Sequence, residues 1–371
     1  MILKSLTILN YKNIAEANLQ FSSKINCFIG SNGEGKTNVL DAIYFLSFTK
    51  SATNANDSLN IRHGEELMML QGSYDLDGTM EEINCGLKIH QKKVFRRNQK
   101  AYKRMADHIG LLPLIIVSPN DSELILGGSE LRRKFIDSVI AQYNATYLPL
   151  LARYNKALQQ RNALLRQCSE ASTPLSSETL ASIEVLEEMM AQSGEQIYAE
   201  RSKFIEAFGP VFQQYYEEIS GGHEKVTLTY TSHCQRGPLL DVIRQGRQKE
   251  LILGYSLHGI HRDDLDMQLT GHPLRYEASQ GQSKTYLISL KLAQFDFLLN
   301  TGSHTTPILL LDDIFDKLDA SRVENIVNLV ARRHFGQIFI TDTNREHLDR
   351  ILQQSPSDYR IFTVRNGVIN S

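Results

Sequence analysis

The residues best suited to chemistry form a glycine-rich run that ends in lysine and threonine. The stretch from Gly30 to Thr37 reads Gly-Ser-Asn-Gly-Glu-Gly-Lys-Thr, the spacing of a phosphate-binding loop. Glycines let backbone N–H groups approach phosphate, Lys36 supplies a positive charge, and the Thr37 hydroxyl is a Mg²⁺ ligand. A helix starting here would point its positive end at the anion. We predict an ATP and Mg²⁺ site made by Gly30, Ser31, Asn32, Gly33, Glu34, Gly35, Lys36, Thr37 and Asn38.

An aspartate pair supplies the second part of this chemistry. Four apolar residues, 308–311, precede Asp312 and Asp313. This pattern predicts a central strand with two acids at its carboxyl end, where open α/β sheets bind ligands. Asp312 would hold Mg²⁺ together with Thr37, and Asp313 would orient or deprotonate the attacking water.

A short polar loop sets the class of nucleotide-binding protein. Ser279-Gln-Gly281-Gln282-Ser precedes a helix with apolar periodicity and resembles the signature loop of ABC-type ATPases. In that class the loop contacts the γ-phosphate of ATP held by a second subunit, which implies nucleotide contacts from Ser279, Gly281 and Gln282. Read alone, Ser279 would be a helix N-cap.

The order of motifs in ABC-type ATPases predicts roles for three other parts of the sequence. Asp319, in the sequence Asp-Lys-Leu-Asp at 316–319, stands where the D-loop of that class makes dimer contacts. Thr341 ends the next predicted strand, in the place of a γ-phosphate sensor, and joins Lys36 and Asp313 as a catalytic candidate. The polar turn 259–265 is expected either near the nucleotide or dimer interface, or as a solvated turn between strands.

A basic segment is the candidate DNA contact. Residues 83–106 contain no Asp or Glu, whereas the whole chain has a net charge of −2. Such segregation suits contact with a phosphate backbone, although an ordinary solvated hairpin is the alternative. Two aromatic residues are too few for a base-stacking platform, so duplex DNA is favoured. The residues predicted to bind DNA are Lys92, Lys93, Arg96 and Arg97.

The elements that position these residues alternate between strand and helix. A strand at 25–29 leads into a helix from Lys36 to about Phe48, and strands at 308–311 and 337–340 flank a helix at 320–334. Between them, helical spacing predicts a hairpin with a loop at 168–179. We expect Gly209-Pro210 to interrupt its second helix. These patterns predict an α/β fold divided as follows: ATPase head 1–136, helical arm 137–222 and ATPase head 223–371.

Composition adds few constraints. The chain is 42% hydrophobic and 22% charged, and its four cysteines form no CxxC pair, so neither a metal site nor a disulfide framework is predicted. The N-terminus lacks a signal-peptide pattern and no apolar run is long enough to span a bilayer. We expect a cytoplasmic protein with no membrane partner.

The sequence resembles the RecF family of bacterial DNA-repair ATPases along nearly its whole length. The resemblance lies in the run after the phosphate loop, in His261-Arg-Asp-Asp-Leu, in 309–319 and above all in the arm segment 160–165, Gln-Arg-Asn-Ala-Leu-Leu. It implies an SMC- and Rad50-like ABC head, a DNA-dependent ATPase and an ATP-dependent homodimer. It also implies binding to duplex DNA near single-strand gaps, work with RecR and RecO in loading RecA, and release by slow hydrolysis.

Other P-loop proteins remain as alternatives. An ABC transporter subunit would have far less sequence between Lys36 and Ser279, and another SMC-like chromosome protein would need a much longer coiled coil. A small-molecule kinase would not require the signature loop.

Overall fold

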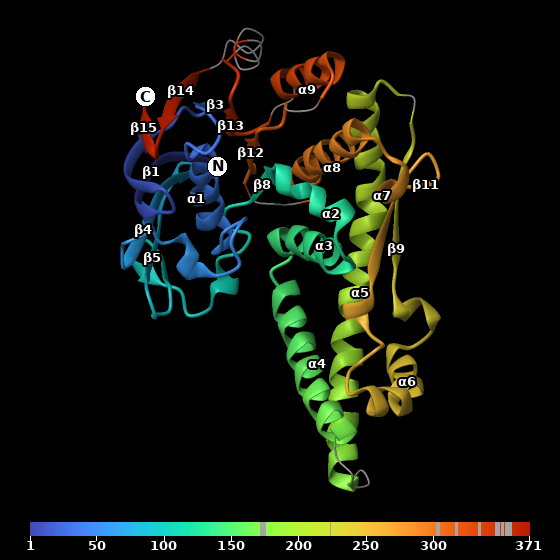
Figure 1. Ribbon diagram of the computed structural model, residues 1–371. Helices are drawn as coiled ribbons and strands as arrows, with labels where there is room; N and C mark the ends of the chain where they lie inside the picture. The colour runs from blue at the N-terminus through green and yellow to red at the C-terminus, as the bar shows by residue number, and fades with distance from the viewer. Residues whose placement is uncertain are drawn as a thin grey trace. The chain divides into compact units, whose positions relative to one another are not determined.

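The chain forms two compact units (Figure 1). The first contains Met1–Ser122, Val211–Glu224 and Ala278–Ser371, and the second contains Glu123–Pro210 and Lys225–Glu277. The computed structural model describes residues 1–170, 176–222, 224–301, 305–315, 318–332, 335–345, 349, 352 and 358–371. The nucleotide-site candidates and the basic segment belong to the first unit.

A mostly parallel sheet forms the centre of the first unit. Its strand order is β15-β14-β3-β13-β12-β8, and only β15 runs antiparallel to its neighbour. Strands β12 and β13 are buried at every residue, as expected where both faces of a sheet are covered. The bounds are β3 Ile25–Ile29, β8 Leu114–Val117, β12 Ile308–Asp312, β13 Ile338–Asp342, β14 Tyr359–Arg365 and β15 Val368–Asn370.

An antiparallel sheet forms the second layer of this unit. Its order is β2-β1-β4-β5-β6-β7, so the basic segment supplies one edge strand, β7, and its neighbour β6. Burial alternates along β4 and β5, the pattern of a sheet with one face packed. The strands are β1 Ile2–Tyr11, β2 Ile14–Gln20, β4 Leu67–Leu76, β5 Thr79–Lys88, β6 Val94–Arg97 and β7 Lys100–Ala101.

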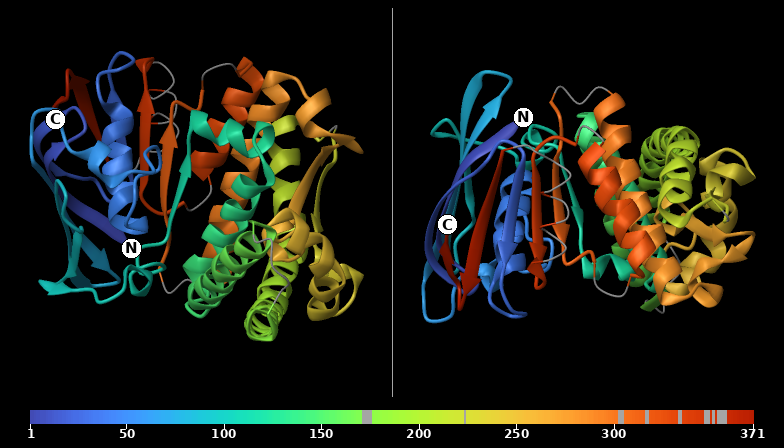
Figure 2. Two further views of the ribbon diagram at one scale, coloured as in Figure 1. Left: turned by 60° about the horizontal axis from the view of Figure 1, so that its bottom comes forward. Right: turned by 90° about the horizontal axis from the view of Figure 1, so that it is seen from above.

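Helix α1, Lys36–Phe48, contacts strands of both sheets, and its buried side chains form one core with them (Figure 2). This helix and strand β3 confirm the predicted strand, loop and helix around the phosphate-binding motif. The remaining helical elements of the unit are η1 Asp57–Asn60, η2 Met105–Asp107, η3 Pro119–Asp121, α8 Gln280–Asn300 and α9 Ala320–Arg332.

The second unit is mainly helical, with the three-stranded sheet β11-β10-β9. Helices α4 and α5 form the predicted hairpin; its tip, 171–175, lies outside the described residues. The elements are α2 Ser122–Leu126, α3 Ser129–Tyr143, α4 Tyr147–Glu170, α5 Ser177–Ser220, β9 Val226–Thr231, η4 His233–Arg236, α6 Leu239–Leu253, η5 Ile260–Arg262, β10 Asp264–Leu269, β11 His272–Pro273 and α7 Leu274–Glu277. The part of α5 from Val211 onward belongs to the first unit.

The two compact units differ from the predicted division into 1–136, 137–222 and 223–371. Residues 123–136 and 225–277, which we assigned to the head, cluster with the helical hairpin instead. Helix α3 packs on β10, where Arg132 Nε lies 2.6 Å from a carboxylate oxygen of Asp264. A contact between residues so distant in sequence leaves no local pattern from which the boundary could be predicted.

The predicted interruption at Gly209-Pro210 is wrong, because α5 continues through it to Ser220. Proline removes one backbone donor, and neighbouring packing can compensate. Phe208 stacks on Phe204, and Phe212 packs edge-on against Tyr286. All three phenylalanines are essentially buried, so tertiary packing outweighs the local break signal.

Candidate nucleotide-binding site

The loop between β3 and α1 has the backbone of a phosphate cradle. Gly33 and Gly35 have φ values of 84° and 113°, in the left-handed region where side chains are strained. A Cβ on Gly35 would lie 2.7 Å from the side chain of Asn13. Ser31, Asn32 and Gly33 are exposed at this loop. The exposed part of the loop therefore lies just before the N-terminus of α1, where backbone N–H groups can bind an anion.

Lys36 is held inside this loop. Its ammonium donates to the carbonyl oxygens of Gly30, at 2.7 Å, and Ser31, at 3.0 Å. The residue is 6% exposed, so its charge is fixed within the cradle. From this position the Lys36 ammonium can donate hydrogen bonds to phosphate oxygens.

The predicted metal and catalytic residues meet at the ends of α1, β12 and β13. The Thr37 hydroxyl donates to Asp312 at 2.9 Å and 3.0 Å from its two carboxylate oxygens. The Thr341 hydroxyl donates to Asp312 at 2.7 Å and accepts from the Asp313 N–H at 3.1 Å. Asp312 and Thr341 are register partners in the parallel sheet. Four residues from three segments that are distant in sequence thus form one hydrogen-bonded group.

The acidic pair sits in an environment that suits a cation. Burial raises the pKa of Asp312, and the hydrogen bonds from Thr341 and Thr37 oppose that rise. Carboxylate and hydroxyl oxygens are the ligands that Mg²⁺ prefers, and this ion keeps most of its remaining ligands as water or phosphate. No described residues form a cluster of three or more His, Cys, Asp or Glu side chains around a metal site. Thr37 and Asp312 fit the limited protein share of a Mg²⁺ site.

Three residues absent from the predictions support the loop. Asn13 donates to the Glu34 carbonyl at 3.1 Å and accepts from the Asn38 amide at 2.8 Å. The Gly367 N–H donates to the same carbonyl at 2.8 Å, and the Asn366 N–H donates to the Glu34 carboxylate. Asn366-Gly367 is a recognisable hairpin turn signal. Nothing local indicates that this turn would hold a loop so distant in sequence.

The signature loop starts α8 with a reciprocal cap. The Gln282 N–H donates to the Ser279 hydroxyl at 3.1 Å, and the Ser279 N–H donates to the Gln282 side chain at 2.8 Å. The Gln282 amide also donates to Glu224, a residue the sequence did not single out. The predicted N-cap is therefore present, and the side chain of Gln282 is engaged in it.

Asp319 begins α9 beside this loop. It accepts from the Ser321 hydroxyl at 2.6 Å and the Arg322 N–H at 2.9 Å, and these hydrogen bonds lower the pKa of its carboxyl. Arg322 also pairs with Asp319 at 3.4 Å, and its guanidinium lies 2.7 Å from where a Cβ on Gly281 would be. Asp319 thus connects to the signature loop through Arg322. Positions 316 and 317 of the expected D-loop lie outside the described residues.

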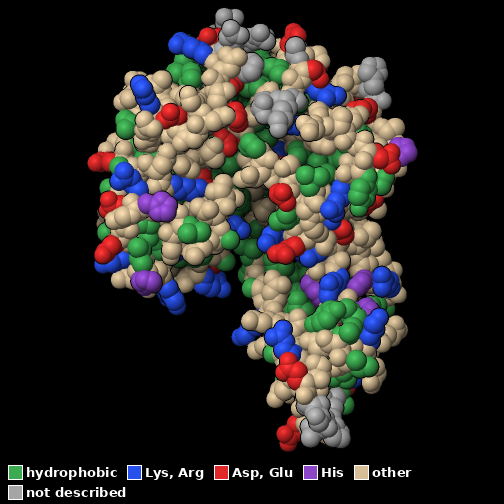
Figure 3. All heavy atoms as spheres, in the orientation of Figure 1, with side chains coloured by type: hydrophobic (Ala, Val, Ile, Leu, Met, Phe, Trp, Pro, Cys, Tyr) green, Lys and Arg blue, Asp and Glu red, His purple; other side chains and the backbone are tan. Residues whose placement is uncertain are grey.

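The basic segment separates into paired and unpaired cations. Lys93 pairs with Asp57 at 2.8 Å, and Arg97 makes two bonds to Glu81 at 2.8 Å and 2.6 Å. Lys92 and Arg96 are exposed, and no carboxylate lies within ion-pair distance of either among the described residues. Figure 3 shows Lys and Arg side chains at the lower end of this unit. The four predicted DNA-binding residues therefore occupy two different environments.

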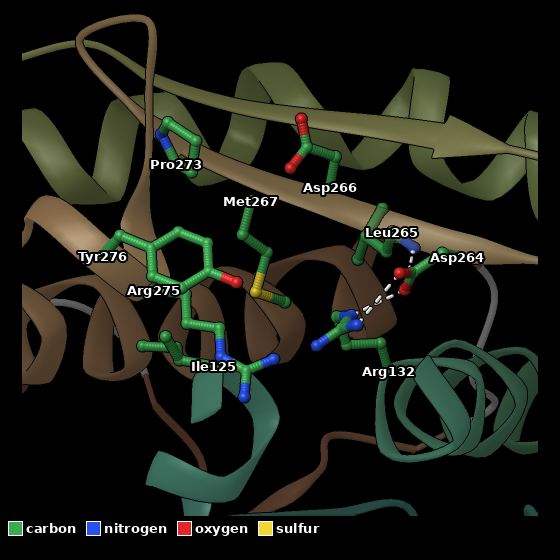
Figure 4. Close-up of a pocket in the computed structure, with 9 residues that line it drawn as sticks. All are labelled: Ile125, Arg132, Asp264, Leu265, Asp266, Met267, Pro273, Arg275 and Tyr276. Carbon is green, nitrogen blue, oxygen red and sulfur yellow. Dashed lines mark hydrogen bonds and ion pairs between the residues drawn. The ribbon is translucent and has the colours of Figure 1, made fainter. Parts of the chain in front are cut away.

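The polar turn 259–265 is part of the second unit and builds its interior. Tyr154 and His261 share a 2.8 Å hydrogen bond, and Arg201 lies 3.1 Å from Asp263. Asp264 accepts from Arg132 at 2.6 Å at one side of a pocket that no nucleotide-motif residue lines (Figure 4). The alternative of a solvated turn is wrong, because Asp263 is 1% exposed. The other alternative, a place near the nucleotide or dimer interface, stays a prediction.

No helix among the described residues is long and apolar enough to cross a membrane.

Comparison with known proteins gives a consistent result. The family described as RecF/RecN/SMC N terminal domain matches residues 2–370. The DNA replication and repair protein RecF of Phocaeicola vulgatus is 58% identical, over all of this chain and 98% of that protein. The RecF of Porphyromonas gingivalis is 50% identical over the full length of both chains.

Solved structures agree with the sequence relatives. The recombination mediator protein RecF-ATP of the RecFOR pathway has a TM-score of 0.86 at 27% identity, covering all of this chain and 97% of the other. An Smc head domain from Pyrococcus furiosus has a TM-score of 0.58 at 16% identity, covering 100% and 95%. The second likeness concerns the fold alone, an α/β ABC-type head of the SMC kind.

Proposed function

This chain belongs to the RecF family of DNA replication and repair proteins, and from that premise we propose that it is an ATP-hydrolysing switch that holds duplex DNA as an ATP-bound homodimer. One observation carries the proposal. Thr37, Asp312 and Thr341 form a single hydrogen-bonded group beside Lys36, with Asp313 at its edge. Such a group is built for phosphoryl transfer from a nucleoside triphosphate to water.

The chain's own residues divide the work. The 30–35 loop and Lys36 bind and orient the phosphates, and Thr37 and Asp312 would hold Mg²⁺, which neutralises charge on the phosphates when bound. Asp313 orients the attacking water and takes its proton. Thr341 positions both acids, because its hydroxyl donates to Asp312 and accepts from the Asp313 N–H. Catalysis here is mainly positioning and electrostatics.

The second half of the switch lies on the partner subunit. Ser279 is exposed at the start of α8, and a helix N-terminus is a natural anion site. In the dimer, Ser279 and Gly281 of one subunit contact the γ-phosphate held by the other, and Asp319 lies at the interface. ATP thereby favours the dimer, and slow hydrolysis releases it.

DNA and protein partners complete the proposal. Lys92 and Arg96 contact the duplex backbone near single-strand gaps, while RecR and RecO act with the dimer to load RecA in the cytoplasm. The support is the family relationship and the exposed cations of the sheet edge. The paired Lys93 and Arg97 act instead as structural residues of that edge.

The test is ATP turnover with and without DNA. We expect phosphate release to rise when a gapped duplex is added, and the Lys36→Met variant to release none, because it lacks the phosphate-facing charge. An equal rate with and without DNA would remove DNA dependence from the proposal. Turnover by Lys36→Met at the wild-type rate would show a contaminating ATPase.

A further inference from the structure

Three large apolar side chains protrude at the end of helix α6, in the second unit. Ile252, Leu253 and Tyr255 are 78%, 42% and 45% exposed. We call these three residues the α6 knuckle. In Figure 3, hydrophobic side chains gather over α6 with Lys and Arg beside them. Contiguous exposed apolar residues of this size mark interaction sites more often than scattered single ones do.

The backbone that carries the knuckle is fixed in place. Gly254 has a φ of 76°, and its N–H closes the helix on the Glu250 carbonyl at 2.9 Å. The N–H and hydroxyl of Ser256 both donate to Asn162 of α4, at 2.8 Å and 2.7 Å. A Cβ on Gly254 would lie 2.7 Å from the Ser169 hydroxyl. A partner would therefore meet a preorganised surface, which lowers the entropic cost of binding.

Cations without carboxylate partners border the knuckle. Lys249 lies one turn before it on α6, and the Arg262 guanidinium lies 5.9 Å from the centre of the Tyr255 ring. The Cα of Arg166 is 3.4 Å from a Cβ built on Gly254. All three cations are exposed, and within the part of the chain that the structure describes none makes an ion pair.

Neighbouring arginines show the contrast. Arg247, on the same helix, lies 2.5 Å from Glu187 and 3.1 Å from Glu184. Arg244 lies 3.5 Å from Glu188. Cations that stabilise this unit are thus already paired with α5, whereas those around the knuckle are available to another molecule.

We propose that the α6 knuckle binds an acidic segment of another protein, one that carries large apolar side chains among Asp and Glu residues. The apolar side chains would cover Ile252 and Leu253, and the carboxylates would meet the bordering cations. DNA is a poorer match, because Ile252 and Leu253 offer a phosphate backbone no hydrogen bond. This surface shares no residue with the nucleotide site or the basic edge, so it stands or falls separately from the proposed function.

The test uses the full chain and three fluorescein-labelled peptides of sixteen residues, about the length of a short amphipathic helix. The first combines Glu and Asp with Leu and Phe, the second has Ser for Leu and Phe, and the third has Gln for the acids. Fluorescence anisotropy should show the first peptide binding about tenfold more tightly than either other. The double variant Ile252→Ser/Leu253→Ser and the double variant Arg166→Glu/Lys249→Glu should each lose that advantage.

The matched control is Leu59→Ser, an apolar side chain 64% exposed in the first unit, which should bind like the wild type. Equal affinity for all three peptides would overturn the proposal, as would unchanged binding by both double variants. Two further results would replace it. Loss of a dimer in nucleotide-free light scattering of Ile252→Ser/Leu253→Ser would assign the knuckle to a second copy, and weakened binding to a labelled duplex by the same variant would assign it to DNA.

Discussion

Thr341 uses one hydroxyl group to bridge both acids of the nucleotide site. The Thr341 hydroxyl donates a hydrogen bond to Asp312 and accepts one from the Asp313 N–H. Asp313 has a φ of 52°, a strained region for a residue with a side chain, so the Thr341 contact helps to hold that backbone. We therefore expect Thr341 to act as a positioning residue between the proposed metal ligand, Asp312, and the proposed base, Asp313.

Replacing that hydroxyl with a methyl group tests this role. Thr341→Val should lower ATP turnover by about tenfold or more, because Asp312 loses a hydrogen bond and the Asp313 N–H keeps only the Thr341 carbonyl, at 3.3 Å, as an acceptor. Thr341→Ser restores a hydroxyl and should recover most activity. Phosphate-release assays at several Mg²⁺ concentrations would measure both. Loss of turnover in Thr341→Ser with normal turnover in Thr341→Val would point to packing of the methyl group instead.

Asp313→Asn separates binding from chemistry. The amide keeps the shape of the carboxylate but cannot take a proton, so ATP binding should persist while turnover falls by roughly 100-fold or more. Binding of a fluorescent ATP analogue and single-turnover hydrolysis would report the two properties. Normal turnover would transfer the catalytic role to another acid, with Asp312 the first to examine.

The buried residue His108 should make the stability of the fold depend on pH. It is fully buried between the Leu46 carbonyl and the Tyr102 hydroxyl, and burial lowers its pKa from 6.5 to about 4. Between pH 4 and pH 6.5, His108 is therefore protonated in the unfolded chain and neutral in the folded protein. The buried, neutral His108 imidazole contributes fully to stability above pH 6.5. As the pH falls towards 4, this contribution is lost and the free energy of unfolding drops by about 3 kcal/mol.

The His108 effect is measured as the slope of urea midpoint against pH. His108→Gln should flatten that slope between pH 6.5 and 4, whatever its effect on absolute stability. His63→Gln changes an exposed histidine and is the matched control. A slope unchanged by His108→Gln would mean that other groups carry the acid sensitivity.

At the scale of elements, strand β6 distributes the basic residues between two roles. Burial along Val94–Arg97 alternates, with Phe95 in the core and Arg96 exposed. Lys93 reaches the Thr49 carbonyl and Asp57, and Arg97 reaches Glu81, whose carboxyl pKa is lowered by hydrogen bonds from Arg97. The sequence indicates a run of charge, whereas the sheet determines which charges are available.

Two matched double variants distinguish these roles. Lys92→Gln/Arg96→Gln should weaken duplex binding across all sequences and flatten its salt dependence by a slope of about 0.9 for each phosphate that the protein no longer neutralises. Lys93→Gln/Arg97→Gln should chiefly lower the free energy of unfolding, by about 1–3 kcal/mol, because Asp57 and Glu81 lose the cations that they pair with. Anisotropy at several salt concentrations and urea unfolding would measure the two. A flattened salt slope in the second variant alone would reverse the assignment.

Sequence reasoning was accurate where the chemistry is local. The loop, Lys36 and Thr37 are contiguous, so spacing alone predicts the strand, the helix and their cradle. It failed where distant segments meet, as between Asn13 and Glu34, or Glu224 and Gln282. Those contacts depend on packing, which leaves no periodicity or motif in the sequence. The same reason explains why α5 passes through Pro210.

At the scale of the whole molecule, the first unit combines two half-sites. The phosphate loop lies at the start of α1 and the signature loop at the start of α8, each with its own supporting residues. Asn13 and the β14–β15 turn hold the first, whereas Glu224 and Arg322 flank the second. In the homodimer that we propose, two copies would exchange these half-sites and complete two nucleotide sites at once, which would couple ATP binding to assembly.

This coupling predicts that ATP, but not ADP, produces a homodimer that binds DNA more tightly than the monomer. A nearly neutral chain with one exposed basic edge should bind a duplex weakly at physiological salt. Two edges in one dimer raise affinity through effective concentration, so ATP controls DNA binding without touching DNA. Light scattering after size-exclusion chromatography, with ATP, ADP or no nucleotide and with or without a gapped duplex, would measure assembly.

Ser279→Arg should bind ATP normally and remain monomeric, because a bulky cation would fill the place of the γ-phosphate. Its DNA affinity with ATP should equal that of the nucleotide-free wild type. Normal dimerisation by Ser279→Arg would show that the signature loop does not act on the partner's nucleotide, and tight DNA binding by a monomeric Ser279→Arg would separate DNA binding from assembly.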